Sequence, residues 1–321
     1  MTECFLGIDT SNYTTSCALY FPDSNSFIKN EQLLAVEHGN RGLRQSDAVF
    51  LHTKNLPELL EKTICDAREK FDGIKIISVS SSSCPRNEPD SYMPCFLVGD
   101  GVKKEISSVL NIPGYSFSHQ QGHIASALFS SGKTELFDKK FLSFHVSGGT
   151  TDLLLVSPDA DNILNIELIA ASLDLKAGQA VDRTGVMLGM DFPSGKFVEE
   201  YALKSDIKYK INPFEKDGSV SFSGLENKVR QMMKNGDSKE HICRYCLDYI
   251  FFAIKKMCVF GRKIYPDYSI VFAGGVMSNK IIRKNIESEF NNVYFAEPSF
   301  SKDNAAGISY LGYLKFKNQI K

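Results

Sequence analysis

One pattern occurs twice in the sequence, and this repeat restricts the possible folds more than any other feature. Residues 9–24 read DTSNYTTSCALYFPDS and residues 145–160 read HVSGGTTDLLLVSPDA, so Thr14 matches Thr150 at an ungapped offset of 136 residues. Each copy predicts a strand, a turn of small residues, a threonine-rich strand, a Pro-Asp turn and a third strand. Two unrelated hairpins are the alternative, because hairpin turns often reuse Pro, Asp and Gly. The segments that follow each copy also repeat, which favours a duplication.

After each copy, helices and strands alternate. The first half predicts helices at about 46–71, at about 94–110 and from His119 onward, with the strands IKIISVSSS and GYSFS between them. The second half predicts the strand YSIVFAGG, a helix at about 279–290, the strand NVYFAEP and a terminal helix from Ser301, after a largely helical insert at about 172–263. This order predicts two α/β lobes with a ligand cleft between them, as in actin, hexokinase and the large heat-shock chaperones.

We expect the first lobe at residues 1–118 and the second at 119–302, with the helix at about 303–321 able to pack across both. Such a fold is a duplicated, two-lobed, actin/hexokinase-like α/β fold with the helical insert in its second lobe. A chain of 321 residues that is 43% hydrophobic can bury a core for two medium domains.

The composition predicts a cytoplasmic protein. A net charge of −1 gives no overall attraction to nucleic acid or to an anionic membrane, although a local basic patch remains possible. The sequence has no apolar run of the roughly 18 residues that a membrane span needs, and the start, MTECFLGIDTS, does not resemble a signal peptide. The eight cysteines are expected to be reduced thiols, and the C-x-x-C of Cys243 and Cys246 is expected to be structural, within a buried helix.

Two glycine pairs indicate nucleotide binding. Gly148 and Gly149 form a tight turn between strands, and Gly274 and Gly275 end an apolar strand just before a helix. Glycine lets a ligand approach the backbone closely, and amides at a helix start favour phosphate. The pairs are expected at equivalent strand ends of the two lobes. Asn279 is either a helix N-cap alone or also a ligand contact.

A pair of histidines suggests a metal site. His119 and His123 are four residues apart, so on a helix both imidazoles share a face. Such a pair is compatible with zinc or iron, but a third ligand is needed; otherwise the histidines belong to the surface or the core. Asp303 is the candidate, because it begins the helix that matches the His119 helix in the other lobe.

The sequence resembles the universal threonylcarbamoyladenosine synthases, catalytic subunits of tRNA modification that were formerly classified as glycoproteases. The resemblance runs nearly end to end. It is carried by the following motifs: GIDTS, HQQGH, VSGGTT, LKAGQAVDRTGVMLG, FPSG, SFSGL, AGGVMSN and KDNAAG.

The resemblance implies one divalent metal ion, iron or zinc, on His119, His123 and Asp303. It also implies a pocket for ATP or threonylcarbamoyl-adenylate, the donor for transfer to an adenosine of tRNA, and heteromeric partner subunits. With Thr150 and Gly275 from the glycine turns, the candidate pocket consists of Ser147, Gly148, Gly149, Thr150, Asp182, Gly195, Gly275 and Asn279. A metal near the phosphate or carbonyl would act as a Lewis acid, so no covalent nucleophile is required and no catalytic residue is assigned.

The sequence departs from the family pattern in four places. Tyr13 and Thr14 replace two acidic residues, Thr150 replaces a histidine, and GSV at 218–220 replaces an acidic position. The family's glycine-proline-glycine loop is also absent. In its place, residues 81–99 read SSSCPRNEPDSYMPCFLVG and carry possible substrate contacts: Arg86, Glu88, Asp90 and Tyr92. A plain surface loop is the alternative to a divergent paralogue with a rebuilt acceptor side.

Several functions remain open. The first is threonylcarbamoyl transfer to tRNA, or to another acceptor. The second is a small-molecule carbamoyltransferase or kinase-like enzyme, and the third is a non-catalytic nucleotide-binding partner of a true synthase. A metalloprotease ranks last, because zinc proteases with this histidine spacing have Glu after the first histidine and this chain has Gln120.

Overall fold

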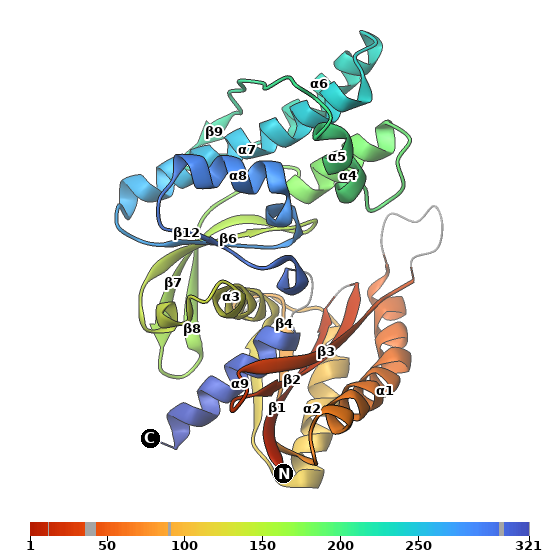
Figure 1. Ribbon diagram of the computed structural model, residues 1–321, viewed down its shortest axis with the longest axis vertical. Helices are drawn as coiled ribbons and strands as arrows, with labels where there is room; N and C mark the ends of the chain where they lie inside the picture. Colours follow the sequence, from red (N-terminus) through yellow and green to blue (C-terminus); the bar gives the residue numbers. More distant parts are fainter. Residues whose placement is uncertain (12, 36–42, 89–90, 302–304, 321) are drawn as a thin grey trace. The chain divides into compact units, whose positions relative to one another are not determined.

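The protein is described here by a computed structural model that covers all residues except 12, 36–42, 89–90, 302–304 and 321 (Figure 1). The chain divides into two compact units. Unit 1 comprises Met1–Phe137, Pro158–Asn165 and Ser299–Lys321; unit 2 comprises Asp138–Ser157 and Ile166–Pro298. The expected boundary after residue 118 therefore differs from the observed one, because the helix that begins at His119 packs within unit 1 against the C-terminal helix.

Unit 1 is built on a mixed five-stranded sheet in the order β3-β2-β1-β4-β5. β1 pairs antiparallel with β2 and parallel with β4, and β4 pairs parallel with β5. The strands are β1 (Thr2–Ser11), β2 (Thr14–Phe21), β3 (Ser26–Leu33), β4 (Ile74–Cys84) and β5 (Gly114–Ser118). Because β1, β4 and β5 are parallel neighbours, their carboxyl ends meet at one edge of the sheet.

The second sheet repeats this plan, with the order β12-β11-β6-β7-β8. Read from its other end, this is again third, second, first, fourth and fifth strand. The strands are β6 (Phe141–Val146), β7 (Thr151–Asp159), β8 (Ile163–Ala171), β11 (Ile270–Ala273) and β12 (Val293–Phe295). The duplicated actin/hexokinase-like fold expected from the sequence is confirmed.

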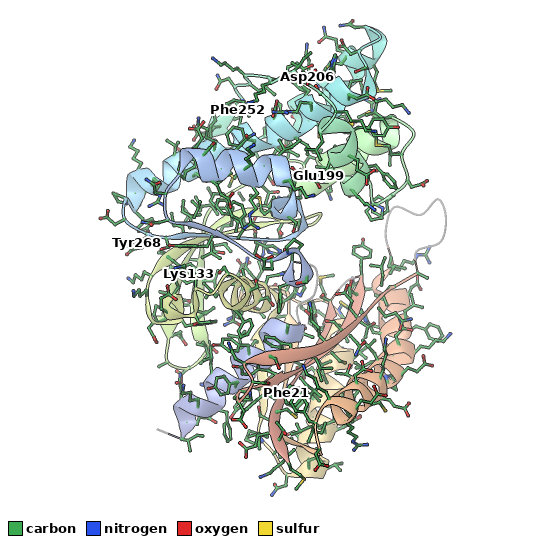
Figure 2. All side chains as sticks on the ribbon, viewed as in Figure 1. Phe21, Lys133, Glu199, Asp206, Phe252 and Tyr268 are labelled. Atoms are coloured by element: carbon green, nitrogen blue, oxygen red, sulfur yellow. The ribbon has the colours of Figure 1, made fainter. Side chains whose placement is uncertain are left out.

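Helices cover both faces of the unit 1 sheet. One face packs on α1 (Gln45–Lys70) and α2 (Phe96–Leu110) through a core that includes Phe21, which is fully buried and labelled in Figure 2. On the other face of β1, a Cβ atom at Gly7 would lie 2.3 Å from the carbonyl oxygen of Ala305, the first residue of α9 (Ala305–Gln319). α9 also packs along α3 (His119–Ser130), which is followed by η1 (Thr134–Asp138).

Unit 2 contains the helical insert expected at 172–263. Its elements are α4 (Ala177–Met187), α5 (Gly195–Ala202), β9 (Glu215–Lys216), β10 (Ser219–Val220), α6 (Ser223–Lys234) and α7 (Lys239–Ile264). After the insert come β11, η2 (Gly275–Ser278), α8 (Lys280–Glu289), β12 and η3 (Pro298–Phe300). Within the described part of the chain, no helix combines the length and the apolarity needed to span a membrane.

Candidate functional sites

In unit 1, polar side chains gather where the parallel strands end. β1 and β4 pair with Ile8 opposite Ser81, so the next residues, Asp9 and Ser82, come side by side at the carboxyl ends of these strands. β5 ends at Ser118, and α3 begins directly after it with His119. Three strand ends therefore bring together three polar side chains: Asp9, Ser82 and His119.

Asp9 is buried, with 1% of its surface exposed, and its carboxylate is fully engaged. Oδ1 accepts hydrogen bonds from Ser82 Oγ (2.7 Å) and from the Ser11 amide (2.8 Å), while Oδ2 lies 2.8 Å from His119 Nδ1. Burial by itself raises the pKa of Asp9, but attraction to His119 and the hydrogen bonds together bring that pKa below its ordinary value. The group is therefore a carboxylate at neutral pH.

Local structure fixes the direction of α3. Ser118 caps the helix in a capping box with Gln121, and the Gln121 side-chain amide donates to the carbonyl oxygens of Asn162 and Leu164, at 2.9 Å each. His119 and His123 share one face of the helix, with ring centroids 4.6 Å apart and the rings inclined at 72°. The side chain of His119 is 23% exposed, and His123 is 7% exposed.

The two histidines fit a metal ion as a pair of ligands. Because Asp9 engages Nδ1 of His119, Nε2 is the nitrogen through which that ring would bind, and a carboxylate behind the ring is the usual support of a metal-binding histidine. In the described residues, no three His, Cys, Asp or Glu side chains form a group that could hold a metal. The predicted third ligand, Asp303, lies outside the described residues, so the metal site remains a prediction.

The expectation that Asp303 belongs to a helix of the other lobe needs correction. α9, which follows it, lies in unit 1 together with α3, because the two helices pack in very close contact. A Cβ atom at Gly307 would be 1.9 Å from the carbonyl oxygen of Gly122. Only a glycine at that position allows α9 to approach the helix that carries both histidines.

The two glycine pairs also share one unit. β6 and β11 are parallel neighbours with His145 opposite Ala273, so the turns after them lie at adjoining strand ends of the unit 2 sheet. The expectation of one pair per lobe was therefore wrong, because β11 is the fourth strand of the same sheet whose first strand is β6. Both turns therefore lie at one edge of the unit 2 sheet.

The turn after β6 is held by its own hydrogen bonds. Ser147 Oγ accepts from the amides of Gly149 and Thr150, at 3.2 Å each, and lies 2.8 Å from Thr150 Oγ1. The Gly149 amide therefore donates within the turn. The Ser147 carbonyl oxygen accepts from the Gly178 amide (3.1 Å), which joins the turn to α4.

The glycines differ in whether a Cβ atom added to them would meet neighbouring atoms. Added Cβ atoms would meet no described atom within 4 Å at Gly148, Gly149, Gly195 or Gly275. By contrast, Gly274 has φ +95°, and a Cβ atom there would lie 2.3 Å from the carbonyl oxygen of Val146. Packing explains Gly274 but not the other four, whose missing side chains leave room for a ligand to contact the backbone.

Two polar side chains lie on the elements beside these turns. Asp182 on α4 accepts a hydrogen bond from the Ser194 amide (2.8 Å), just before Gly195 begins α5, and burial raises its pKa. Asn279 caps α8, since its Oδ1 accepts from the amides of Ile281 and Ile282, at 3.1 Å each. The N-cap role of Asn279 is confirmed, whereas its contact with a ligand remains a prediction.

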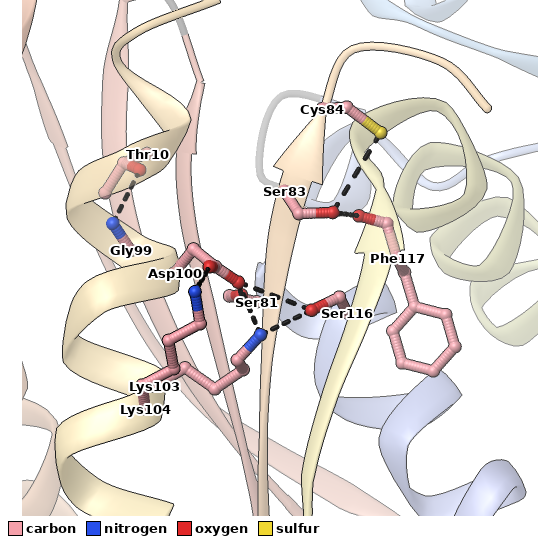
Figure 3. A network of polar contacts seen from close by, with 10 residues as sticks. All are labelled: Thr10, Ser81, Ser83, Cys84, Gly99, Asp100, Lys103, Lys104, Ser116 and Phe117. Carbon is pink, nitrogen blue, oxygen red and sulfur yellow. Dashed lines mark hydrogen bonds and ion pairs between the residues drawn. The ribbon is translucent and has the colours of Figure 1, made fainter. Parts of the chain in front are cut away.

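The loop between β4 and α2 is anchored beside the histidine helix. The Pro85 carbonyl oxygen accepts from the Gln120 amide (3.1 Å), and Ser83 Oγ donates to the Phe117 carbonyl oxygen (3.3 Å; Figure 3). At its other end, the Cys95 carbonyl oxygen accepts from Thr10 Oγ1 (2.9 Å). Between these anchors Glu88 and Tyr92 are exposed, Tyr92 by 62%, and Arg86 is half-buried. Asp90 lies outside the described residues.

Sequence reasoning missed three polar residues of unit 1. Asp9 and Ser82 were available as polar residues at strand ends, but the contact of Asp9 with His119 spans 110 positions and that of Ser82 with Asp9 spans 73, and no local pattern indicates either pair. His52 on α1 is fully buried, its Nδ1 lies 2.8 Å from Thr15 Oγ1, and burial lowers its pKa to about 4. The sequence pattern of an amphipathic helix does not indicate that a histidine within it is fully buried or that it contacts a distant threonine.

The C-x-x-C segment has the environment of a structural element. Cys243 and Cys246 lie on α7, both fully buried, and burial raises the pKa of each thiol to about 12. A thiol with such a pKa is protonated at neutral pH and is neither a ready nucleophile nor a ready metal ligand.

Comparison with known proteins gives a consistent result. The family model described as tRNA N6-adenosine threonylcarbamoyltransferase matches residues 39–310. The tRNA N6-adenosine threonylcarbamoyltransferase of Sulfurihydrogenibium sp. (strain YO3AOP1) is 30% identical over 331 residues, which cover 98% of this chain and 91% of that protein.

Solved structures extend the comparison of the fold. Component A of (R)-2-hydroxyglutaryl-CoA dehydratase from Acidaminococcus fermentans is 15% identical with a TM-score of 0.56, covering 98% of this chain and 99% of its own. HypF of T. kodakarensis is 10% identical with a TM-score of 0.58, covering 99% of this chain and 48% of its own. Identities this low concern the fold alone.

Proposed function

This chain belongs to the tRNA N6-adenosine threonylcarbamoyltransferase family, and on that premise we propose that it transfers a threonylcarbamoyl group from an adenylate to adenosine in tRNA. The proposal assigns a divalent metal ion, zinc or iron, to His119, His123 and Asp303, and the adenine nucleotide to the glycine turns of unit 2. It includes partner subunits of the kind the family resemblance implies, and a cytoplasmic location.

The observation that carries the proposal is the placement of the motif residues at strand ends. In unit 1 the histidines follow the parallel strand β5, and in unit 2 the open glycines follow the parallel strands β6 and β11. Loops at the carboxyl ends of parallel strands are where α/β folds bind ligands. Each unit therefore offers one set of chemically suitable residues at the edge where ligand binding is expected.

The residues of unit 1 hold the imidazoles in place. Asp9 and Ser82 orient His119, and the Ser118–Gln121 capping box fixes the first turn of α3. A bound divalent metal supplies Lewis-acid stabilisation of negative charge on a phosphate or carbonyl oxygen. With such a group present, transfer requires no covalent enzyme intermediate.

The residues of unit 2 are suited to the nucleotide half of the donor. The open positions at Gly148, Gly149 and Gly275 admit phosphate oxygens close to the backbone. Asp182, held by the Ser194 amide through Oδ1, accepts hydrogen bonds from ligand hydroxyls or amines, and Asn279 lies near the phosphates. Ser147 and Thr150 keep the turn in shape, since their hydroxyl groups are bonded to each other.

The loop at 84–95 favours a diverged acceptor. It replaces a glycine-rich element of the family with a segment that is anchored at both ends, exposes Tyr92 and carries Arg86, Glu88 and Asp90. An arginine fork suits a carboxylate or phosphate, and an exposed aromatic ring suits stacking on a base. We assign acceptor choice to this loop, with tRNA as the first acceptor to test.

Nucleoside analysis by mass spectrometry tests the function directly. Purified protein is incubated with zinc or ferrous ion, threonylcarbamoyl-adenylate and unmodified tRNA, alone and with candidate partner subunits. Formation of threonylcarbamoyladenosine that depends on wild-type protein supports the proposal. Tight adenylate binding without turnover, even with partners, would instead indicate a non-catalytic partner, and transfer only to a small molecule would indicate the alternative enzyme.

A further inference from the structure

Asp9 contacts one of the proposed metal ligands, and its two oxygens are used unequally. Oδ1 accepts two hydrogen bonds, from Ser82 Oγ and from the Ser11 backbone amide, whereas Oδ2 contacts only Nδ1 of His119 among the bonds described above. The carboxylate cannot rotate freely, because a backbone amide fixes one oxygen and the group is 1% exposed.

We propose that Asp9 is a positioning residue that keeps the proton of His119 on Nδ1, so that Nε2 presents its lone pair to the metal ion. The inference rests on the metal assignment in the proposed function. A carboxylate can only accept hydrogen bonds, so the nitrogen facing it must carry a proton, and in a neutral imidazole the other nitrogen is then the ligand. Carboxylate partners of this kind support metal-binding histidines generally.

The surrounding structure makes Asp9 a rigid support. β1 and β4 are neighbouring strands in the middle of the sheet, so the positions of Asp9 and Ser82 are set by backbone pairing. On the opposite side, His119 is held in the first turn of α3 by the Ser118 cap. The contact between Asp9 and His119 therefore joins two fixed elements and determines the orientation of the ring.

The unequal use of the two oxygens predicts what an asparagine would do. In Asp9→Asn, the remaining oxygen is required at the Oδ1 position, because the Ser11 amide there can only donate. The new amide nitrogen then faces His119 and donates to Nδ1. The proton of the ring moves to Nε2, and the ring loses the lone pair that would bind the metal, although the side chain has hardly changed in size.

Metal affinity provides the first test. Full-length wild type and variants are titrated with Zn²⁺ in competition with a chelator of known affinity. We expect Asp9→Asn to bind zinc about 10- to 100-fold more weakly, as for other lost partners of metal-binding histidines. Ser82→Ala, which removes one bond to Oδ1, should have a smaller effect. Asp100→Asn is the matched control, since this carboxylate of the same unit bonds lysines and serines and should leave affinity unchanged.

The second test needs no metal, and its first readout is made on the wild type. ¹⁵N NMR of histidine in the metal-free wild type, with the His119 signals identified from His119→Gln, should show a proton on Nδ1. In Asp9→Asn it should show the proton on Nε2. A wild type with Nε2 protonated, or an Asp9→Asn protein that keeps both wild-type zinc affinity and the Nδ1 proton, would overturn the role of Asp9 alone. A wild type that binds no zinc would overturn the metal assignment, and this inference with it.

Discussion

The first strand and turn of unit 1 and their counterparts in unit 2 follow the same backbone plan but present different chemistry. Position 9, at the end of β1, is an aspartate that bonds the histidine helix; position 145, its counterpart at an offset of 136, is a buried histidine. The turn after β1 has no glycine, whereas the turn after β6 is Ser-Gly-Gly-Thr with open space beside both glycines. The two strand ends are equivalent in sheet topology, and the side chains that they carry differ.

The largest expected effect tests whether the histidine pair of unit 1 is the metal site. Replacing His119 by alanine should reduce bound metal from about one ion per chain to nearly none, since a site with few protein ligands does not survive the loss of one. Elemental analysis after reconstitution with zinc or ferrous ion measures this. His241→Ala, on α7 of unit 2, is the control and should retain the metal. Equal, near-zero metal in all three proteins would contradict the assignment of a metal site to the histidine pair.

The glycines of unit 2 allow a sharper test within one motif. Gly274→Ala should lower the free energy of unfolding by about 3 kcal/mol or more, because φ is +95° and the new Cβ atom meets the Val146 carbonyl oxygen. Gly275→Val should leave stability nearly unchanged and weaken adenylate binding about tenfold or more, because its space is open to a ligand.

Urea unfolding and calorimetry with a stable adenylate analogue measure these two effects. If both variants lost stability and kept adenylate affinity, the glycines would serve only the fold. Wild type without any adenylate binding at millimolar ligand would count against the nucleotide site itself.

Unit 1 should also respond to pH through His52. Burial lowers the pKa of His52 to about 4, below its unfolded value near 6.5, so the unfolded chain binds the extra proton between these values. The contribution of neutral, buried His52 to the free energy of unfolding is fully present above pH 6.5 and is lost as the pH falls toward 4. Between pH 7.5 and 4.5 we expect wild type to lose about 2 kcal/mol more than His52→Gln, by urea unfolding at each pH. The same loss in both proteins would assign the pH dependence to other groups.

The smallest expected effect concerns the loop at 84–95, to which we assign acceptor choice. Arg86→Ala combined with Tyr92→Ala should leave adenylate affinity unchanged, because that site is assigned to unit 2, and should slow transfer about tenfold. A loss of this size is roughly 1.4 kcal/mol, comparable to one stacking or ionic contact. Lys104→Ala, an exposed residue of α2 paired with Asp100, is the control. Full transfer to ordinary tRNA by the double variant would make the loop structural.

Local patterns predicted most of the fold, because strand order and helix positions depend on hydrophobic periodicity and on the repeat. The helix at 46–71 is observed as Gln45–Lys70, and the strand YSIVFAGG contains β11. The unit to which the last helix belongs was not predictable, since the contact between Gly122 and Gly307 joins residues 185 positions apart. For the candidate sites too, local patterns were predictable and long-range contacts were not. Motif residues were found by type and spacing, whereas Asp9 was found only once the sheet had brought it to His119.

The last helix has a consequence for how the protein is made. α9 lies at residues 305–319, yet its first turns cover the face of β1 that begins at residue 2, and Phe5 packs edge-on against Tyr313 at 5.2 Å between ring centroids. During translation the N-terminal sheet therefore leaves the ribosome long before the helix that covers it, and unit 2 is synthesised in the interval. At about 5–20 residues per second, the uncovered face of the completed sheet waits on the order of 10 to 40 seconds for its cover. Chaperone binding during synthesis would be most useful in that interval.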